Sequence, residues 1–240
     1  MASRIVAGSM LALLLVAATA HAQGNPDYAA IVAAPDRSAA DRAMDASRRP
    51  APWLAFLGVK PGMTVLDVFD VNGYKSELMA RAGAKVYAQN SDRAYARVKG
   101  QLEARLKTPA GANIVTIVRP LDDPAPHGAQ FDLVTFFFAY HDITYLGVDR
   151  PKMLKAIYLA LKPGGYFIMG DWSAPPGAGT SVVKTLHRSD EALARKEIEA
   201  AGFTLVAEGD FLRHPEDKRD THSHIAKNVD AYVLKFQKPD

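Results

Sequence analysis

The chain of 240 residues contains no cysteine, so it can form neither a disulfide nor a lipid-modified cysteine anchor. It also lacks runs of charge of one sign, because 29 basic and 26 acidic residues are intermixed and the formal net charge is +3. The sequence therefore offers no basic patch of the kind that binds a phosphate backbone, and we expect no nucleic-acid partner. Its stability has to come from the packing of an apolar core.

Long apolar runs are missing as well, except near the N-terminus, where one follows Arg4 and covers residues 5–20. This run is shorter than the roughly 20 residues of a membrane-spanning helix. The sequence Ala20-His21-Ala22 at its end has the A-x-A form of a signal-peptidase site. We expect residues 1–22 to be a cleaved signal peptide and the mature protein to be exported, to the periplasm or the medium, without a membrane span. An uncleaved N-terminal anchor is the alternative.

The residues after the signal peptide suffice for one large domain with a full core. A polar, alanine-rich stretch over residues 35–50, PDRSAADRAMDASRRP, predicts an exposed helix that ends at Pro50. We therefore divide the chain into the signal peptide 1–22, an N-terminal helical extension 23–50 and a main domain 51–240. Nothing in the sequence predicts the oligomeric state.

Short apolar, β-branched runs alternate with helical stretches along the main domain. Strands are expected at 64–69, 85–90, 113–118, 131–138, 165–171, 204–210 and 230–236, and helices at 74–83, 91–107, 149–165 and 189–203. This alternation predicts a mostly parallel sheet covered by helices on both faces. The last two runs follow each other without a long helix, which predicts an antiparallel pair at one edge. The expected fold is α/β, a Rossmann-like, doubly wound, seven-stranded and mostly parallel sheet with an antiparallel edge strand.

Several motifs carry a resemblance to a known family. They are GVKPGMTVLDV (58–68), FDLVTFFFAYHD (131–142), ALKPGGYF (160–167), KTLHRSDE (184–191) and DAYVLKFQKP (230–239). With these motifs the chain resembles the class I S-adenosylmethionine-dependent methyltransferases, and among them a bacterial group of exported, predicted methyltransferases. The resemblance covers residues 36–239. It implies S-adenosylmethionine as the cofactor and a small molecule as the substrate.

The resemblance implies a cofactor site at the carboxyl ends of the first strands, where glycines let the backbone approach the ligand. Asp67 stands at the acidic position that closes the first strand, and Gly73 at the last glycine of the following turn. Phe69 and Val71 stand where that turn usually has its first two glycines. Alternatively, Asp67 and Gly73 only shape a turn between a strand and a helix.

Other candidates follow the second and third strands. Asn90 replaces the carboxylate that usually binds the ribose, while Asp122 and Asp123 are the candidates at the adenine end, or simply part of a turn. Because Val71 disfavours a positive φ and fills space near the methionine end, and Asn90 lacks a charge, we expect weak cofactor binding. We expect Val71→Gly and Asn90→Asp to strengthen binding nearly additively.

The reacting region of the family follows the fourth strand, where this chain has Tyr140, His141 and Asp142. Methyl transfer needs the acceptor to be positioned and, for a hydroxyl or amine, deprotonated. We expect His141 to act as the base, Asp142 to orient it, Tyr140 to form a wall of the acceptor pocket and His187 to lie on the same rim. Structural roles in the loops are the alternative.

A histidine-rich stretch, RHPEDKRDTHSHIAK, covers residues 213–227. Its spacing is not that of a closed structural zinc site. We expect a solvated loop between the last two strands and no metal centre, and metal binding by this stretch is the alternative.

Three functions compete for this sequence. The first is a small-molecule methyltransferase that uses S-adenosylmethionine, and the second is a non-catalytic binding module that keeps the methyltransferase fold with weak or lost cofactor binding. A nicotinamide-dependent oxidoreductase is disfavoured because the chain lacks G-x-G-x-x-G. Export argues against the first function, since S-adenosylmethionine is made in the cytoplasm, whereas the polar YHD and LHR motifs argue for it.

Overall fold

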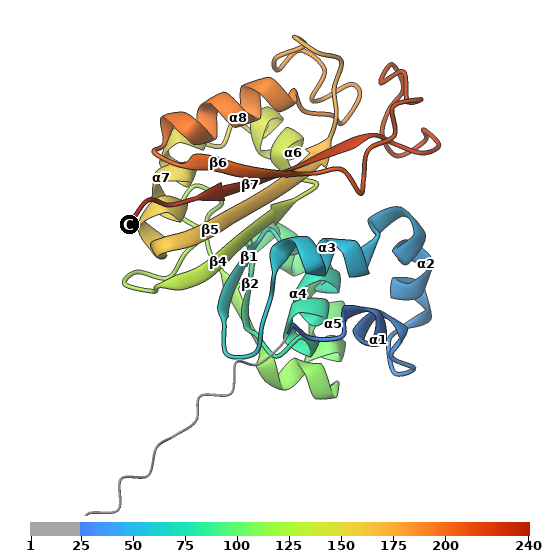
Figure 1. Ribbon diagram of the computed structural model, residues 1–240, viewed down its shortest axis with the longest axis vertical. Helices are drawn as coiled ribbons and strands as arrows, with labels where there is room; N and C mark the ends of the chain where they lie inside the picture. The colour runs from blue at the N-terminus through green and yellow to red at the C-terminus, as the bar shows by residue number, and fades with distance from the viewer. Residues whose placement is uncertain (1–24) are drawn as a thin grey trace, which may run out of the picture.

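A computed structural model describes residues 25–240 (Figure 1). The predicted signal peptide, residues 1–22, lies outside the described residues. The described chain forms one sheet with the order β3-β2-β1-β4-β5-β7-β6. Its strands are β1 Thr64–Val68, β2 Lys85–Asn90, β3 Ile114–Val118, β4 Phe131–Phe137, β5 Leu161–Trp172, β6 Thr204–Gly209 and β7 Ala231–Gln237. Strands β1 to β5 are parallel, and β7 pairs antiparallel with both β5 and β6.

The expected fold class is confirmed, and the strand order adds one detail to it. The reversed strand β7 is not the outermost strand but lies between β5 and the edge strand β6. Strands β2 and β3 lie on one side of β1, and β4 and β5 lie on the other. The direction in which the sheet grows along the sequence therefore changes between β1 and β4. In open α/β sheets, ligands bind at the carboxyl ends of the strands beside such a switch point.

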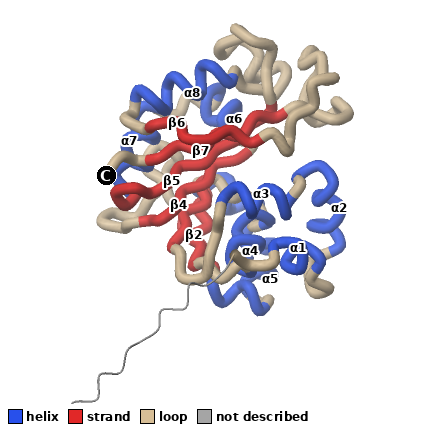
Figure 2. Tube along the Cα trace, in the orientation of Figure 1, coloured by secondary structure: helices blue, strands red, loops and turns tan. Residues whose placement is uncertain are grey.

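Helices cover both faces of the sheet (Figure 2). They are α1 Tyr28–Ala33, α2 Ala39–Arg48, α3 Pro50–Leu57, α4 Tyr74–Arg81, α5 Asp92–Leu106, α6 Tyr140–Tyr145, α7 Arg150–Ala160 and α8 Glu191–Ala200, with a 3-10 turn at Pro109–Asn113. Buried side chains of α3 and α4 form one core with β1 and β2, and those of α7 and α8 form a second core on the opposite face. Within residues 25–240, no helix combines the length and apolar character that a membrane crossing requires.

Two elements differ from the sequence-based expectation. Strand β5 begins at Leu161, so the Lys162-Pro163-Gly164-Gly165 break lies inside it, where an irregular register against β4 and a φ of +70° at Gly164 absorb the extra residues. Residues 140–142 were expected in a loop, yet they form the first turn of the short helix α6.

The N-terminal extension packs against the main domain through buried ion pairs. Arg105 of α5 binds Asp41 of α2 at 2.8 Å and also contacts Glu77 of α4, and Arg37 binds Asp45 at 2.7 Å. The Arg105 pairs join α2 to α4 and α5, whereas the Arg37–Asp45 pair lies within the extension. The extension therefore contributes one wall of the site described next.

Candidate functional site

The turn after β1 keeps the backbone of a glycine turn although only one glycine remains. Phe69, Val71 and Gly73 have φ values of 52°, 63° and 83°, in the left-handed region that glycine adopts freely and a β-branched residue rarely adopts. Val71 adopts this conformation although its β-branched side chain disfavours a positive φ. Such a strained residue costs on the order of 1–3 kcal/mol of folding free energy. Its side chain remains 38% exposed.

Side chains at the end of β2 hold the strained turn in place. Gln89 accepts a hydrogen bond from the backbone N–H of Phe69 at 2.9 Å. Asn90 accepts one from the N–H of Val71 at 2.9 Å and donates its amide to the Val71 carbonyl at 3.3 Å. Asn90 is fully buried, and both ends of its side chain are engaged with the turn. The contact expected between Asn90 and a ribose is therefore not the one that this side chain makes.

Asp67 is buried at the end of β1 and fastens neighbouring elements together. Its carboxyl accepts hydrogen bonds from Thr135 of β4 at 2.9 Å and from Ser76 of α4 at 3.1 Å, and Lys75 Nζ lies 3.7 Å away. Burial raises the pKa of Asp67 well above its ordinary value, and the charge of nearby Asp70 adds to this although Lys75 opposes it. Asp67 thus shapes the turn, and its raised pKa favours the neutral carboxyl group.

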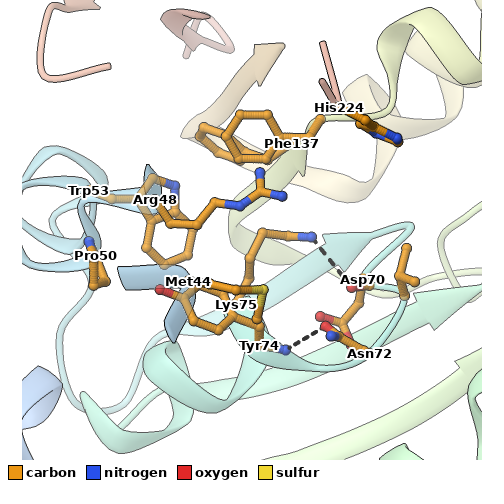
Figure 3. Close-up of a pocket in the computed structure, with 12 residues that line it drawn as sticks. Met44, Arg48, Pro50, Trp53, Asp70, Asn72, Tyr74, Lys75, Phe137 and His224 are labelled. Carbon is orange, nitrogen blue, oxygen red and sulfur yellow. Dashed lines mark hydrogen bonds between the residues drawn. The ribbon is translucent and has the colours of Figure 1, made fainter. Parts of the chain in front are cut away.

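A cavity of about 330 Å³ opens beside the turn (Figure 3). Elements distant in sequence form it: α2, α3, the turn after β1, the start of α4, the end of β4 and the loop between β6 and β7. The lining residues are Met44, Arg48, Pro50, Trp53, Asp70, Val71, Asn72, Tyr74, Lys75, Phe137, Phe138 and His224. Most of these side chains are apolar or aromatic, so the few charged groups among them decide what the cavity attracts.

Asp70 brings a negative charge to the cavity. The residue is 3% exposed, and no nitrogen or hydroxyl donor among residues 25–240 reaches its carboxyl oxygens, which have the carboxyl group of Asp67 as a neighbour. Lys75 Nζ instead contacts the backbone oxygen of Asp70 at 3.5 Å. A buried carboxylate without a donor is costly, so this group is suited to a cationic ligand.

Arg48 brings a positive charge from α2 (Figure 3). Its guanidinium lies 3.9 Å from the ring centre of Phe138 and 5.0 Å from that of Trp172. Its Nη1 atom is buried and has no acceptor among the described residues. Burial lowers the pKa of Arg48 to about 10, with the charges of Tyr74 and Asp171 acting in the opposite direction. The side chain is therefore a cation at neutral pH with a free donor for an anionic ligand.

The two acidic candidates for the adenine end are paired with basic side chains. Asp122 accepts a hydrogen bond from Lys152 at 2.7 Å, and Asp123 contacts Arg119. Neither residue lines the cavity. Neither acidic group is therefore free to bind a ligand in the cavity.

His141 is oriented by an acidic residue other than the one expected. Its Nδ1 lies 2.8 Å from Oδ1 of Asp171 at the end of β5, whereas Asp142 Oδ1 lies 3.6 Å from its Nε2. Burial opposes the charged form, but the charge and hydrogen bond of Asp171 outweigh it, so the pKa of His141 is raised. Ser189 donates a hydrogen bond to Asp171 at 2.7 Å and fixes it. The pairing leaves Nε2 of His141 available.

Tyr140 does not form a wall of the cavity. Its side chain is buried in the core that α7 and α8 form with the sheet, and its hydroxyl group donates a hydrogen bond to Glu197 of α8. The reason is its position on α6, because successive residues of a helix point in different directions. Tyr140 and His141 therefore face different surroundings.

His187 lies beside His141, as expected from the sequence. Their ring centres are 5.0 Å apart, and His187 Nδ1 is 3.9 Å from Asp142 Oδ1. Burial and the neighbouring charge of His141 lower the pKa of His187. The histidine-rich stretch also joins this region, since the ring of His222 lies 4.6 Å and that of His224 5.3 Å from the ring of His187. A loop that was only solvated would not pack against His187, so the sequence did not predict the contacts of His222 and His224.

Three functional candidates escaped the sequence-based reasoning: Arg48, Asp70 and Asp171. Asp171 closes the apolar run of β5, and an acidic residue at the carboxyl end of a central strand is a signal that could have identified it. Asp70 lies within the turn at 69–73, where only the positions that usually hold glycine were considered as candidates. Arg48 gives no such signal, because its place depends on how α2 packs across the cavity.

Comparisons with known proteins agree with this fold. The sequence model of the family described as "Methyltransferase domain" matches residues 67–169. A ubiquinone/menaquinone biosynthesis C-methyltransferase, UbiE, of Klebsiella pneumoniae is 25% identical over 162 residues, which cover 65% of this chain and 59% of that protein. The chain thus spans about three fifths of the length of the curated relatives it matches.

Solved structures show the same architecture. A SAM-dependent methyltransferase from Aquifex aeolicus aligns with a TM-score of 0.60 at 16% identity, over 88% of this chain and 98% of that one. The glycopeptide N-methyltransferase MtfA, solved with sinefungin, aligns with a TM-score of 0.59 at 16% identity, over 82% and 87%.

The reversal of strand order beside β1, the turn at 69–73 and the reversed strand β7 define a class of Rossmann-like methyltransferase folds. Residues 67–169 thus match the methyltransferase domain family, and the described chain has the fold of S-adenosylmethionine-dependent methyltransferases.

Proposed function

We propose that this protein transfers the methyl group of S-adenosylmethionine to a small-molecule acceptor. The observation that carries the proposal is the pair of charged groups in the cavity, one carboxylate and one guanidinium, each buried with at least one polar atom unpartnered. The amino-acid end of S-adenosylmethionine carries an ammonium and a carboxylate, which are the complementary groups. The turn at 69–73 supports the proposal because it keeps the backbone conformation of the family although two glycines are replaced.

Each residue has a separate task in binding. Asp70 accepts hydrogen bonds from the ammonium group, and Arg48 donates to the carboxylate. Trp53, Phe137 and Phe138 supply apolar walls that exclude water from the charged contacts and so strengthen them. When bound, S-adenosylmethionine supplies a methyl group on a sulfonium, which an acceptor displaces in line.

The acceptor side of the site faces the loop between β6 and β7, from which His224 lines the cavity. His141 with Asp171 has the geometry of an oriented imidazole, and its role as the proton acceptor stays a prediction. Its ring is not among the cavity-lining residues, so a base role requires the acceptor to extend beyond the cavity toward α6.

A second candidate function is a binding module with weak or lost catalysis. The observation that favours it is the engagement of Asn90, Asp122 and Asp123 within the protein, which leaves fewer free partners for adenosine. We propose on the same ground that the cofactor binds weakly. The two functions share the cavity and differ in whether an acceptor is methylated.

Calorimetric titration with S-adenosylhomocysteine tests the proposal. Asp70→Asn and Arg48→Met each remove one charged contact, and hydrogen bonds to charged groups contribute about 1.5–3 kcal/mol, so each variant should bind roughly 10- to 100-fold more weakly. Asp92→Asn is the matched control, because Asp92 is an exposed residue at the start of α5 and removes the same charge away from the cavity.

A melting curve of each variant separates binding from folding. Asp70→Asn removes a buried carboxylate that has no donor, so the free protein should melt at the same or a higher temperature while binding is lost. A lower melting temperature with binding unchanged would mean that Asp70 is structural. If the natural protein gives no heat and no thermal shift at millimolar ligand, the assignment of the cavity is wrong.

A further inference from the structure

Four histidines from three separate segments meet at the carboxyl ends of β4 and β5. His141 belongs to α6, His187 to the connection between β5 and α8, and His222 and His224 to the connection between β6 and β7. Their ring centres form a chain of contacts: 5.0 Å from His141 to His187, 4.6 Å from His187 to His222 and 5.2 Å from His222 to His224. Asp142 lies among them.

Three of these residues offer ligand atoms at nearly the spacing that a metal ion requires. One atom each from His141, Asp142 and His187 lie within 4.8 Å of one another. Nitrogen and oxygen ligands at about 2.0–2.1 Å from a tetrahedral ion are about 3.3 Å apart. The measured separations from Asp142 Oδ1, 3.6 Å to His141 Nε2 and 3.9 Å to His187 Nδ1, need only small side-chain adjustments to reach that value.

His141 is prepared as a ligand by its neighbours. Its Nδ1 pairs with Asp171, which leaves the lone pair of Nε2 directed away from that carboxylate. Metal-bound histidines commonly pair their second ring nitrogen with a carboxylate in this way, which fixes the tautomer and the ring orientation. Asp171 is itself held by Ser189 and by the backbone N–H of Trp172. Asp171 and Ser189 would therefore hold His141 in place as a metal ligand.

His187 gives a second, independent indication of a missing partner. Its Nδ1 is buried and has no hydrogen-bond partner among the described residues. The residue also has a φ of 48°, a backbone conformation that is uncommon outside glycine and that costs free energy. Buried polar atoms are nearly always satisfied in native proteins, and a bound ion would satisfy this one.

We propose that His141, Asp142 and His187 bind a divalent transition-metal ion such as Zn²⁺, with His222 or His224 as a further ligand. Two or three imidazoles with one carboxylate are typical of zinc, copper, nickel and iron sites and not of magnesium or calcium sites. The loop histidines make the site continuous with the cavity, because His224 lines it. A bound ion would occupy the lone pair of His141 Nε2. A general base needs the same lone pair, so His141 cannot bind the ion and accept a proton at the same time.

Zinc titration of untagged protein, stripped of metal with a chelator, tests this site without any cofactor or acceptor. We expect one ion per chain with a micromolar or lower Kd, and visible absorption bands of tetrahedral Co²⁺ when cobalt replaces zinc. His187→Ala and Asp142→Asn should each weaken binding at least about 10-fold. Asp171→Asn, which changes only the positioning shell, should weaken it roughly 10- to 100-fold.

The control is His127→Ala, because the His127 side chain is 85% exposed on the opposite half of the sheet, after β3. It should bind zinc like the natural protein. Melting curves identify any variant that fails to fold. Because the His187 side chain is only partly buried, His187→Ala still tests the site if His141→Ala does not fold. No zinc binding, or equal binding by the natural protein and His187→Ala, would overturn the proposal. Equal weakening by His127→Ala would reduce it to adventitious surface binding.

Discussion

At the scale of single residues, backbone strain gathers around the site. Seven non-glycine residues of the described chain have a positive φ, and three of them, Val71, Phe138 and His187, border the cavity or the histidine cluster. Such residues persist only where surrounding contacts hold them, and they concentrate at binding sites. Here the contacts are known for Val71, whose backbone is bonded at both ends by Asn90.

Val71→Gly should therefore relieve strain. We expect the free energy of unfolding to stay equal or rise by up to about 2 kcal/mol, since relief of about 1–3 kcal/mol exceeds the 0.5–1 kcal/mol entropic cost of glycine. The change should also tighten S-adenosylhomocysteine binding, because the side chain borders the cavity. Urea unfolding and titration measure both effects.

Val115→Gly is the matched control for this prediction. Val115 is similarly exposed, at 36%, but lies in strand β3 with ordinary strand geometry. Glycine there should destabilise the protein by roughly 0.5–1 kcal/mol. If Val71→Gly costs as much as the control, the positive φ at Val71 carries no strain that glycine can relieve.

The structure also changes the expectation for Asn90→Asp, the substitution that the sequence suggested combining with Val71→Gly. From the sequence, Asn90→Asp appeared to restore a ribose ligand and to act independently of Val71→Gly. In the structure Asn90 donates its amide to Val71, and an aspartate would lose this bond and place a carboxylate against a carbonyl. Because the two residues touch, their effects should be coupled. Sequence position could not reveal this, since the bond depends on the conformation of the turn.

At the scale of elements, α2 matters because it carries Arg48 to the cavity. Arg105 holds this helix through Asp41 and Glu77, and its side chain is only 11% exposed. Arg105→Met leaves the buried carboxylate of Asp41 without its cation and Glu77 with Arg81 alone, so we expect a loss of about 3–5 kcal/mol in the free energy of unfolding. It should also weaken S-adenosylhomocysteine binding by loosening α2.

Arg195→Met serves as the control at the same scale. Arg195 is 46% exposed on α8 and pairs with Glu199 and Glu208 at the surface. Exposed pairs contribute little, so the change in unfolding free energy should be below about 1 kcal/mol, with binding unchanged. Equal effects of the two substitutions in urea unfolding would show that Arg105 does not fasten α2.

The elements themselves were predictable because their signals are local. Apolar runs such as FDLVTFF mark buried strands, and Ser91, a residue type that favours the start of a helix, caps α5 within the expected helix 91–107. The short helix α6 was missed because six residues that begin with YHD have no helical periodicity to read. The place of β7 between β5 and β6 was also beyond the local signals, since strand order is a property of long-range pairing.

At the scale of the whole molecule, the site depends on contacts between distant segments. The sequence identified the turn at 67–73 and the pair His141 and His187, which follow the central strands. It did not identify Arg48 or the approach of His222 and His224, because helix α2 and the loop between β6 and β7 reach the site only through tertiary packing. Residue type and spacing cannot specify such packing.

Export is a proposal for the molecule as a whole, supported by the apolar run at residues 5–20 and the sequence Ala20-His21-Ala22. The mature protein in the cell envelope should begin at Gln23. N-terminal sequencing of protein purified from a native envelope fraction measures this directly. Recovery of chains that still begin at Met1, from the cytoplasmic fraction alone, would contradict export.

The most direct measurement of the central claim compares two ligands that share adenosine and differ at the other end. S-adenosylhomocysteine carries the amino-acid group that Asp70 and Arg48 are placed to bind, whereas 5′-methylthioadenosine lacks it. We expect calorimetry to give at least about 10-fold tighter binding of S-adenosylhomocysteine, and we expect Asp70→Asn to reduce this difference to the part that Arg48 contributes. Equal affinities for the two ligands in the natural protein would contradict the account, because the charged cavity would then play no part in binding the cofactor.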